Sequence, residues 1–412
     1  MSRAALVAVL SIVSAFLTGC PPPAKMEPFK PEKDYGKALP PGQMALRKIP
    51  LEQYPDFSRG FAYRNNLEQA VRYSLQYMSK PSSEHFFPYL DISHQRAVKS
   101  LEAFLQVLRE AQSPEQLNQL IRDRFEVYES VGYDGNGVVF FTGYYTPIFD
   151  GRKQPDSVFR YPLYGAPVDL LKGEDGAIVG RRAPDGRTVP YFSRREIEEQ
   201  KLLEGHEIAW LKDPFEVYVV TVQGSAKLRL ADGSLWDLGY AGNNGLDYVS
   251  VPQKMIAEGA MKPNELSLQT MIRYFHAHPD KVQYYTWMNP RYVFFQEVTG
   301  GPWGCLGVPV TTRHSVATDK TVFPRACVAF VDTQVGYVDG DQVRQATYAA
   351  FACDQDRGGA IRAAGKCDIY MGIGPDAEAI AGRTAAEGRL YYVFIRPELM
   401  GTGPVSAGEV RD

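Results

Sequence analysis

The sequence has few of the residues that metal, redox and nucleic-acid sites use. Among 412 residues there are 5 cysteines and 6 histidines. No two cysteines have the CxxC spacing of a redox or zinc site, and no histidines form an HExxH pattern; His276 and His278 lack a matching acid. The formal net charge is −3, which is not the electrostatic footprint of a nucleic-acid-binding protein. We therefore expect no metal, no cofactor and no nucleic-acid partner.

Long hydrophobic runs are also missing, except at the N-terminus. Residues 4–17 form an almost unbroken apolar run behind Arg3. The run is shorter than the roughly 20 residues that a permanent membrane helix needs, but it fits the apolar core of a secretory signal. It ends in LTGC at 17–20, followed by three prolines. This arrangement resembles a bacterial lipobox, in which the cysteine is lipidated.

The lipobox predicts how the protein is exported and held. We expect residues 1–19 to be a lipoprotein signal peptide and Cys20 to carry the lipid anchor in the membrane. Pro21 follows in place of an acidic residue, which favours the periplasmic face of the outer membrane. The alternative is an ordinary secretory signal followed by a chance cysteine.

The remaining chain changes character twice. Residues 20–48 are rich in proline, which predicts an extended tether. Apolar residues then recur at helical spacing, with Ser113 and Pro114 suited to opening the third helix. From residue 138 onward, β-rich segments predominate. The expected helices are 67–78, 97–108, 114–124 and 265–277; the expected strands are 138–141, 215–220, 227–230, 292–295, 328–331, 346–353 and 390–395, with a hairpin turn at 231–234.

Four cysteines remain after Cys20. An exported protein enters an oxidising compartment, so an even number of cysteines permits disulfides. Cys353 and Cys367 bracket a glycine-containing loop, and we predict a bond between them, with Cys305 and Cys327 as a second pair. The alternative is four buried free thiols.

The segment between these two cysteines contains the most reactive groups. Gly358 and Gly359 follow Asp356 where the backbone must turn tightly or admit a substrate. Asp368 stands between Cys367 and Ile369, in an apolar, strand-like setting. A carboxyl that is partly shielded from water there is a candidate general acid. The alternative is a solvated aspartate on an edge strand.

Several motifs extend this pattern over most of the chain. ATD at 317–319, DRGGAI at 356–361 and DIY at 368–370 resemble the three aspartate motifs of the 3D domain, in the expected order. FTGYYTP at 141–147, VQGS at 222–225, NPRYVFF at 289–295 and GIGP at 372–375 are similar to motifs of the membrane-bound lytic murein transglycosylase A family. The resemblance runs from about residue 50 to residue 398.

The resemblance implies a mainly β fold with N-terminal helices. Residues 49–144 and 301–398 would form a double-psi β-barrel catalytic domain, with the 3D motifs at 317–372. Residues 145–300 would form a smaller inserted β-barrel domain, with a groove between the two. The tail, 399–412, matches nothing in the family pattern.

The resemblance also implies an activity. Members of the family are carbon–oxygen lyases that cleave the β-1,4 bond between N-acetylmuramic acid and N-acetylglucosamine in peptidoglycan. The muramic 6-hydroxyl attacks its own C1 and leaves a 1,6-anhydro end. Asp368 would be the single catalytic acid and base, supported by Asp356 and Asp319. One acid suffices because the substrate supplies its own nucleophile, whereas hydrolytic glycosidases usually need two carboxylates.

The same motifs supply candidate contacts to the glycan strand. The substrate-binding residues implied by the resemblance are Tyr144, Tyr145, Thr146, Gln223, Gly224, Gly358 and Gly359. Two other functions remain open at this point. One is a peptidoglycan or glucan hydrolase on the same barrel; the other is a non-catalytic lipoprotein that binds peptidoglycan.

The lipid anchor predicts a change of location on mutation. Cys20→Ala removes the thiol that would be acylated, so the protein should move from the membrane fraction to the soluble periplasm, or remain as unprocessed precursor. Cell fractionation followed by immunoblotting measures this. A Cys20→Ala protein that stays entirely in the membrane fraction would place the anchor elsewhere.

Overall fold

The computed structural model describes residues 33–173, 178–262, 265–266, 268–339 and 342–401. The chain divides into an N-terminal unit, Met1–Asp34, and a second unit, Tyr35–Asp412, which contains every element described below. The predicted signal peptide, Cys20 and the first part of the tether lie outside the described residues. Within these residues, every helix is too short or too polar to cross a membrane.

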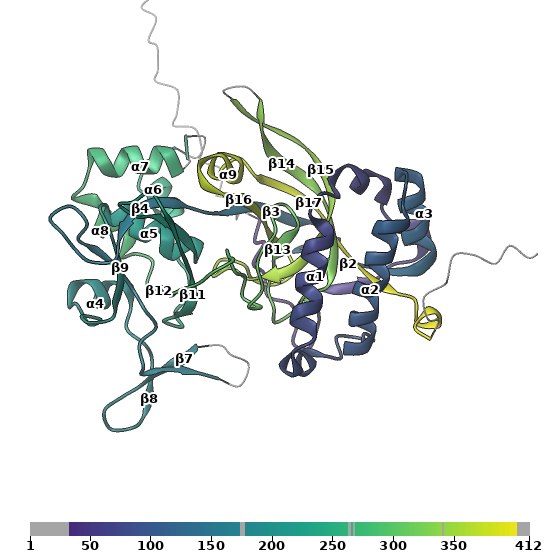
Figure 1. Ribbon diagram of the computed structural model, residues 1–412, viewed down its shortest axis with the longest axis horizontal. Helices are drawn as coiled ribbons and strands as arrows, with labels where there is room; N and C mark the ends of the chain where they lie inside the picture. Colours follow the sequence, from purple (N-terminus) through teal and green to yellow (C-terminus); the bar gives the residue numbers. More distant parts are fainter. Residues whose placement is uncertain (1–32, 174–177, 263–264, 267, 340–341, 402–412) are drawn as a thin grey trace, which may run out of the picture. The chain divides into compact units, whose positions relative to one another are not determined.

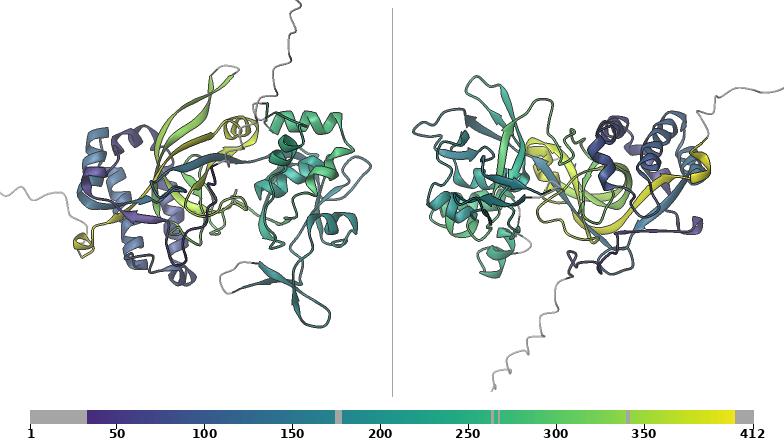
Figure 2. Two further views of the ribbon diagram at one scale, coloured as in Figure 1. Left: turned by 180° about the vertical axis from the view of Figure 1, so that it is seen from behind. Right: turned by 90° about the horizontal axis from the view of Figure 1, so that it is seen from below.

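Three amphipathic helices precede the long strands, as the spacing of apolar residues predicted. Ser93 and Ser113 accept hydrogen bonds from the backbone N–H groups of Arg96 and Gln116, which caps the second and third helices. Figures 1 and 2 show the helices together beside strand β2. They are α1 (Leu67–Met78), α2 (His94–Glu110) and α3 (Pro114–Arg124); short 3-10 turns are η1 (Leu51–Gln53), η2 (Phe57–Tyr63), η3 (Pro81–Phe86) and η5 (Pro397–Leu399).

The larger sheet closes into a barrel. Its order is β1-β2-β17-β14-β15-β13-β16-β3, and β3 also pairs with β17, which joins six of the eight strands in a ring. β1 and β2 extend the sheet outside the ring. The strands are β1 (Leu46–Lys48), β2 (Phe125–Ser130), β3 (Val139–Thr146), β13 (Ser315–Ala317), β14 (Val328–Asp339), β15 (Gln342–Asp356), β16 (Lys366–Ile373) and β17 (Ala385–Ile395), with α9 (Gly374–Ala381) between the last two.

A second, smaller sheet is formed by the residues between β3 and β13. Its order is β12-β11-β10-β4-β9-β5, and a bridge from Gly165 to Phe295 links its two edges. A three-stranded sheet, β6-β7-β8, is formed by residues between β5 and β9. The strands are β4 (Ile148–Arg152), β5 (Tyr161–Tyr164), β6 (Leu170–Lys172), β7 (Ile178–Arg182), β8 (Thr188–Val189), β9 (Glu207–Leu211), β10 (Ala226–Arg229), β11 (Leu235–Asn243) and β12 (Val293–Glu297). The helices are α4 (Arg194–Glu199), α5 (Pro214–Gln223), α6 (Val251–Ala257), α7 (Leu268–Ala277) and α8 (Lys281–Thr286).

The two sheets have separate hydrophobic cores. Phe57, Phe104 and Phe351 are among the buried side chains that join α1–α3 to the barrel. Leu228 and Phe295 belong to a different buried cluster inside the smaller sheet. The mainly β fold with N-terminal helices and two barrel-like sheets is therefore confirmed. The double-psi crossing and the domain boundaries at 144/145 and 300/301 stay predictions.

One expected strand was wrong. Apart from Glu216, residues 215–220 are β-branched or aromatic, yet they lie in helix α5. Asp213 accepts hydrogen bonds from the N–H groups of Phe215 and Glu216, and Pro214 occupies the first turn. Gly224 ends the helix with a φ of 78°. These start and stop signals override the β propensity of the residues between them.

The close contact between strand β3 and helix α9 at Gly143 can be tested by mutation. A Cβ at Gly143, in β3, would lie 2.7 Å from the Cα of Ala381 in α9. Gly143→Ala must push the helix away from the strand, and it should lower the free energy of unfolding by about 1–3 kcal/mol. Urea denaturation of the variant measures the loss. Gly401→Ala is the control, because no described atom lies within 4 Å of a Cβ there; equal midpoints for both variants would contradict the close contact.

Candidate active site

The short strand β13 brings the three acidic motifs together. It pairs in parallel with β15 and antiparallel with β16. Ala317 lies opposite Asp356 on one side and opposite Asp368 on the other, and Asp319 follows at the end of the strand. Adjacent strands lie about 4.8 Å apart, so the backbones of Asp356 and Asp368 are roughly 10 Å apart across β13.

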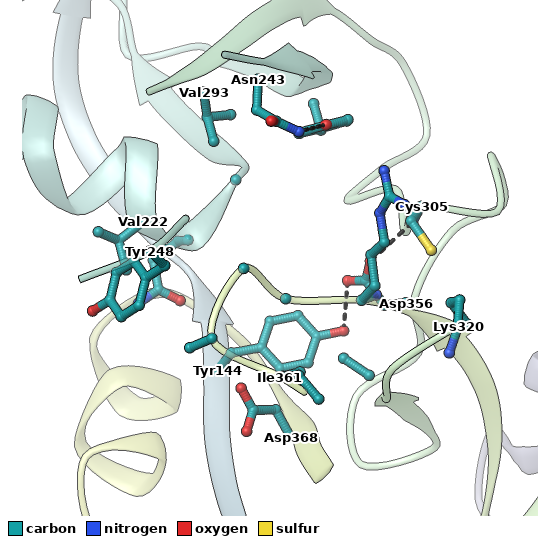
Figure 3. Close-up of a pocket in the computed structure, with 18 of the residues that line it drawn as sticks. Tyr144, Val222, Asn243, Tyr248, Val293, Cys305, Lys320, Asp356, Ile361 and Asp368 are labelled. Carbon is teal, nitrogen blue, oxygen red and sulfur yellow. Dashed lines mark hydrogen bonds between the residues drawn. The ribbon is translucent and has the colours of Figure 1, made fainter. Parts of the chain in front are cut away.

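A groove of about 470 Å³ opens over this strand and is lined by residues of both sheets. Figure 3 shows the ring of Tyr144 between Asp368 and Asp356 in this groove. Most of the site residues expected from the sequence line it: Tyr144, Gln223, Gly224, Asp319, Asp356, Gly358, Gly359 and Asp368.

Asp368 is held on one side and open on the other. Its register partner in β3 is Thr142, whose hydroxyl donates a hydrogen bond to Oδ1. Lys366 Nζ lies 3.8 Å from the same oxygen. The Asp368 side chain is 17% exposed, and a Cβ placed on Gly358 would lie 3.9 Å from Oδ2. Oδ2 therefore faces the groove and the segment 358–361, which we call the glycine loop.

Asp356 is tied to its surroundings by three donors. Oδ1 accepts from the backbone N–H groups of Cys305, at 2.9 Å, and Arg357, at 2.8 Å. Oδ2 accepts from the Tyr144 hydroxyl at 2.9 Å. Burial raises the pKa of Asp356, and these hydrogen bonds act in the opposite direction. The carboxyl thus fixes the Tyr144 ring next to Asp368.

Asp319 joins the end of β13 to the loop that precedes β16. Its Oδ1 accepts from the Thr321 N–H at 3.0 Å and from the Thr321 hydroxyl at 2.7 Å. Its Oδ2 accepts from the backbone N–H of Ala363 at 2.7 Å. These contacts tie Ala363, in the segment between Gly359 and β16, to the end of β13.

Two expected substrate-binding residues do not line the groove. Side chains alternate along a strand, so Tyr145 points away from the Tyr144 side and donates a hydrogen bond to Glu378 Oε2 at 3.2 Å. Thr146 is buried and lies 3.0 Å from the Tyr370 hydroxyl. Gln223 has a second role, because its side-chain oxygen accepts from the Tyr145 N–H at 3.4 Å.

A buried ion pair lies beside the groove and was not anticipated from the sequence. Lys320 pairs with Asp354, and both side chains are at most 2% exposed. Asp354 Oδ2 also accepts from the hydroxyls of Thr318, at 2.7 Å, and Tyr392, at 2.8 Å. A buried pair needs such additional hydrogen bonds to offset desolvation. The position of Lys320, directly after the ATD motif, is the one signal in the sequence that points to it.

Models of known protein families match two parts of the chain. The MltA specific insert domain matches residues 140–296, and the 3D domain matches residues 314–394. A curated relative, membrane-bound lytic murein transglycosylase A from Escherichia coli (strain K12), is 30% identical over 290 residues, which cover 69% of this chain and 72% of the relative.

Solved structures share the fold. A membrane-bound lytic murein transglycosylase from Agrobacterium tumefaciens superposes with a TM-score of 0.71 at 25% identity, over 86% of this chain and 99% of that chain. E. coli MltA with bound chitohexaose has a TM-score of 0.66 at 24% identity, over 89% of this chain and 98% of that chain.

The disulfides expected from the sequence were wrong: all four cysteines are free thiols. β13 lies between β15, which carries Cys353, and β16, which carries Cys367. Two strand spacings, about 10 Å, exceed the roughly 7 Å that a disulfide spans between Cα atoms. The Cys305 and Cys327 sulfurs contact different carbonyls, those of Gln355 and Arg325. In the part of the chain that the structure describes, no group of three His, Cys, Asp or Glu side chains could hold a metal ion.

These thiols should resist alkylation until the protein unfolds. Burial raises the pKa of Cys305 and of Cys353 to about 12, so little thiolate forms at neutral pH. Iodoacetamide should label these thiols slowly in the native protein. In urea it should label all four, without added reductant. Mass spectrometry of non-reduced peptides counts them. A linked Cys353–Cys367 peptide in the native protein would contradict the structure.

Proposed function

The chain belongs to the membrane-bound lytic murein transglycosylase A family, and we propose that it cleaves peptidoglycan glycan strands without adding water. The bond broken is the β-1,4 link from N-acetylmuramic acid to N-acetylglucosamine, and the new end is 1,6-anhydromuramic acid. The observation that carries the proposal is the unequal state of the three described groove aspartates. Asp319 and Asp356 are bound by backbone donors, while Oδ2 of Asp368 faces the groove.

This inequality favours a transglycosylase over a hydrolase. A hydrolytic glycosidase usually needs a second carboxylate as nucleophile or as the base that activates water. Asp356 is the nearest candidate along the ladder, but its oxygens already accept from two N–H groups and from Tyr144. The nucleophile is therefore assigned to the substrate, and the proton carrier to Asp368.

The proposed reaction moves one proton out and one back. Protonated Asp368 donates its proton to the glycosidic oxygen as the bond from C1 to that oxygen breaks. The 6-hydroxyl of the same sugar attacks C1, and its proton goes to the Asp368 carboxylate, which restores the acid. Intramolecular attack avoids the entropic cost of positioning a water molecule.

Neighbouring groups support both states of Asp368. The Thr142 hydroxyl fixes Oδ1, so the exchangeable proton is carried by Oδ2 on the groove side. Lys366, at 3.8 Å, stabilises the carboxylate that exists between the two transfers. Thr142 lies within the FTGYYTP motif, which is the signal that could have identified it from the sequence.

The glycan strand is assigned to the groove floor and walls. Tyr144 offers an aromatic ring beside Asp368, and Gln223 and Gly224 contribute polar groups from the end of α5. Gly358 and Gly359 leave room for a sugar close to Oδ2. The lipid anchor at Cys20 completes the proposal, because it would hold the enzyme at the periplasmic face of the outer membrane; the name of the E. coli relative, membrane-bound, supports it.

Product analysis tests the reaction. Digestion of purified sacculi should release muropeptides with 1,6-anhydro ends, lighter by one water than reducing-end products. Mass spectrometry separates the two. Reducing ends alone would replace the transglycosylase by a hydrolase, and no soluble product would favour the non-catalytic binding lipoprotein.

Asp368→Asn tests the proton carrier. The amide keeps the shape but cannot donate and retrieve a proton, so the rate should fall by about 10⁴-fold, the upper end for a general acid–base group. Binding to glycan strands should persist. Asp339→Asn, which changes an exposed carboxyl outside the groove, is the matched control. An Asp368→Asn rate within tenfold of the wild type would assign the chemistry to another residue.

A further inference from the structure

Three arginines converge at the glycine loop of the groove. Arg357 precedes this loop, Arg362 follows it, and all three line the groove. Arg291, which precedes β12, packs against the loop so closely that a Cβ on Gly359 would lie 2.8 Å from its Nε. Burial lowers the pKa of Arg291, Tyr240 and Asp247 act in the opposite direction, and the positive charges of Arg362 and Arg357 lower it further.

Little negative charge balances this cluster. Arg362 reaches Asp247 at 3.3 Å, but the Asp247 side chain is 94% exposed, where an ion pair contributes little. Among the described residues, neither Arg291 nor Arg357 has a carboxylate within 4.0 Å. Arg291 Nη1 donates instead to the backbone oxygen of Leu246 at 2.9 Å. Like charges held together with so little compensating negative charge favour an anion from outside.

The neighbouring aspartates do not fill this role. Asp356 attracts Arg357, but its oxygens already accept from the Cys305 and Arg357 N–H groups and from Tyr144. The oxygens of Asp319 are likewise taken by backbone and hydroxyl donors. The whole chain carries a net charge of −3, so the cluster is a local feature and not part of a basic surface.

The cluster is also close to the proposed reaction centre. The glycine between Arg357 and the rest of the loop, Gly358, faces Oδ2 of Asp368. A sugar whose glycosidic oxygen contacts Oδ2 of Asp368 therefore places its substituents next to the glycine loop. N-acetylmuramic acid differs from N-acetylglucosamine in one substituent, a lactyl ether that ends in a carboxylate or in an acidic peptide.

We propose that Arg291, Arg357 and Arg362 form a carboxylate-binding subsite that recognises the acidic substituent of the muramic acid residue. The inference rests on the proposed function and adds a basis for choosing the bond that is cleaved. A guanidinium group binds a carboxylate through two parallel hydrogen bonds. The subsite selects the muramic acid for the position at Asp368, and an uncharged chito-oligosaccharide gains nothing from it.

The test compares affinities in an Asp368→Asn background, where no substrate is consumed. The ligands are peptide-bearing glycan strands, peptide-free glycan strands that retain the lactyl carboxylate, and chitohexaose. The variants are Arg357→Gln with Arg362→Gln, and Arg357→Lys with Arg362→Lys. Arg109→Gln is the matched control, because Arg109 is an exposed arginine on α2 outside the groove.

The measured quantity is the ratio of the Kd for chitohexaose to the Kd for each carboxylate-bearing strand. The Gln pair should reduce this ratio on the order of tenfold, the effect of losing a charge-assisted hydrogen bond. The Lys pair should reduce it less, and Arg109→Gln should leave it unchanged. Loss with the peptide-free strand alone assigns the carboxylate to the lactyl group, loss with the peptide-bearing strand alone assigns it to the peptide, and equal loss with both strands shows that the subsite accepts either carboxylate.

An unchanged ratio in the Gln pair would overturn the subsite, whether no affinity is lost or the affinities for chitohexaose and for the natural strands fall equally. Thermal unfolding midpoints of each variant check that the fold is retained. Failure of the proposed function is a separate result, since it appears as absent 1,6-anhydro products from the wild-type enzyme, whatever the affinity ratio.

Discussion

The double pairing of β13 is the constraint on which the active site depends. All three residues of this strand pair with β15, and Val316 and Ala317 also pair with β16, so Ala317 separates Asp356 from Asp368 by a fixed number of strand spacings. Closure of the ring through β3 then places Thr142 alongside Asp368 on its other side. Segments that are more than 200 residues apart in sequence, such as Thr142 and Asp368 with a separation of 226, are thereby held in register by backbone hydrogen bonds.

This geometry gives similar side chains different tasks. Asp319 and Asp356 are acceptors for backbone N–H groups and organise the loops around the groove. Asp354, fully buried and paired with Lys320, links the end of β13 to the barrel interior through the hydroxyls of Thr318 and Tyr392. Asp368 retains one oxygen on the groove side. In the proposed mechanism a single proton carrier is sufficient because the substrate brings its own nucleophile, and the strand pairing of β13 would supply the positioning that this chemistry requires.

Sequence patterns predicted the features that depend on local signals and on ordered motifs. The apolar spacing predicted α2, the cap at Ser113 predicted the start of α3, and the aspartate motifs predicted which residues meet in the groove. The failures involve spatial relations. Cys353 and Cys367 are near in sequence, but β13 separates their strands. Tyr145 follows Tyr144, yet strand alternation turns it towards Glu378. The arginine cluster was missed because a net charge near zero conceals a local excess.

Isotope incorporation from water tests the central claim most directly. If the 6-hydroxyl of the muramic acid is the nucleophile and Asp368 only moves protons, digestion of sacculi in water enriched in ¹⁸O should give products that contain no ¹⁸O at C1. Mass spectrometry of the new glycan ends after short digestion, before slow exchange of any reducing end, makes the measurement. Products that carry one ¹⁸O atom per cleaved bond would contradict the account, because water would then be the nucleophile and a second carboxylate would have to activate it.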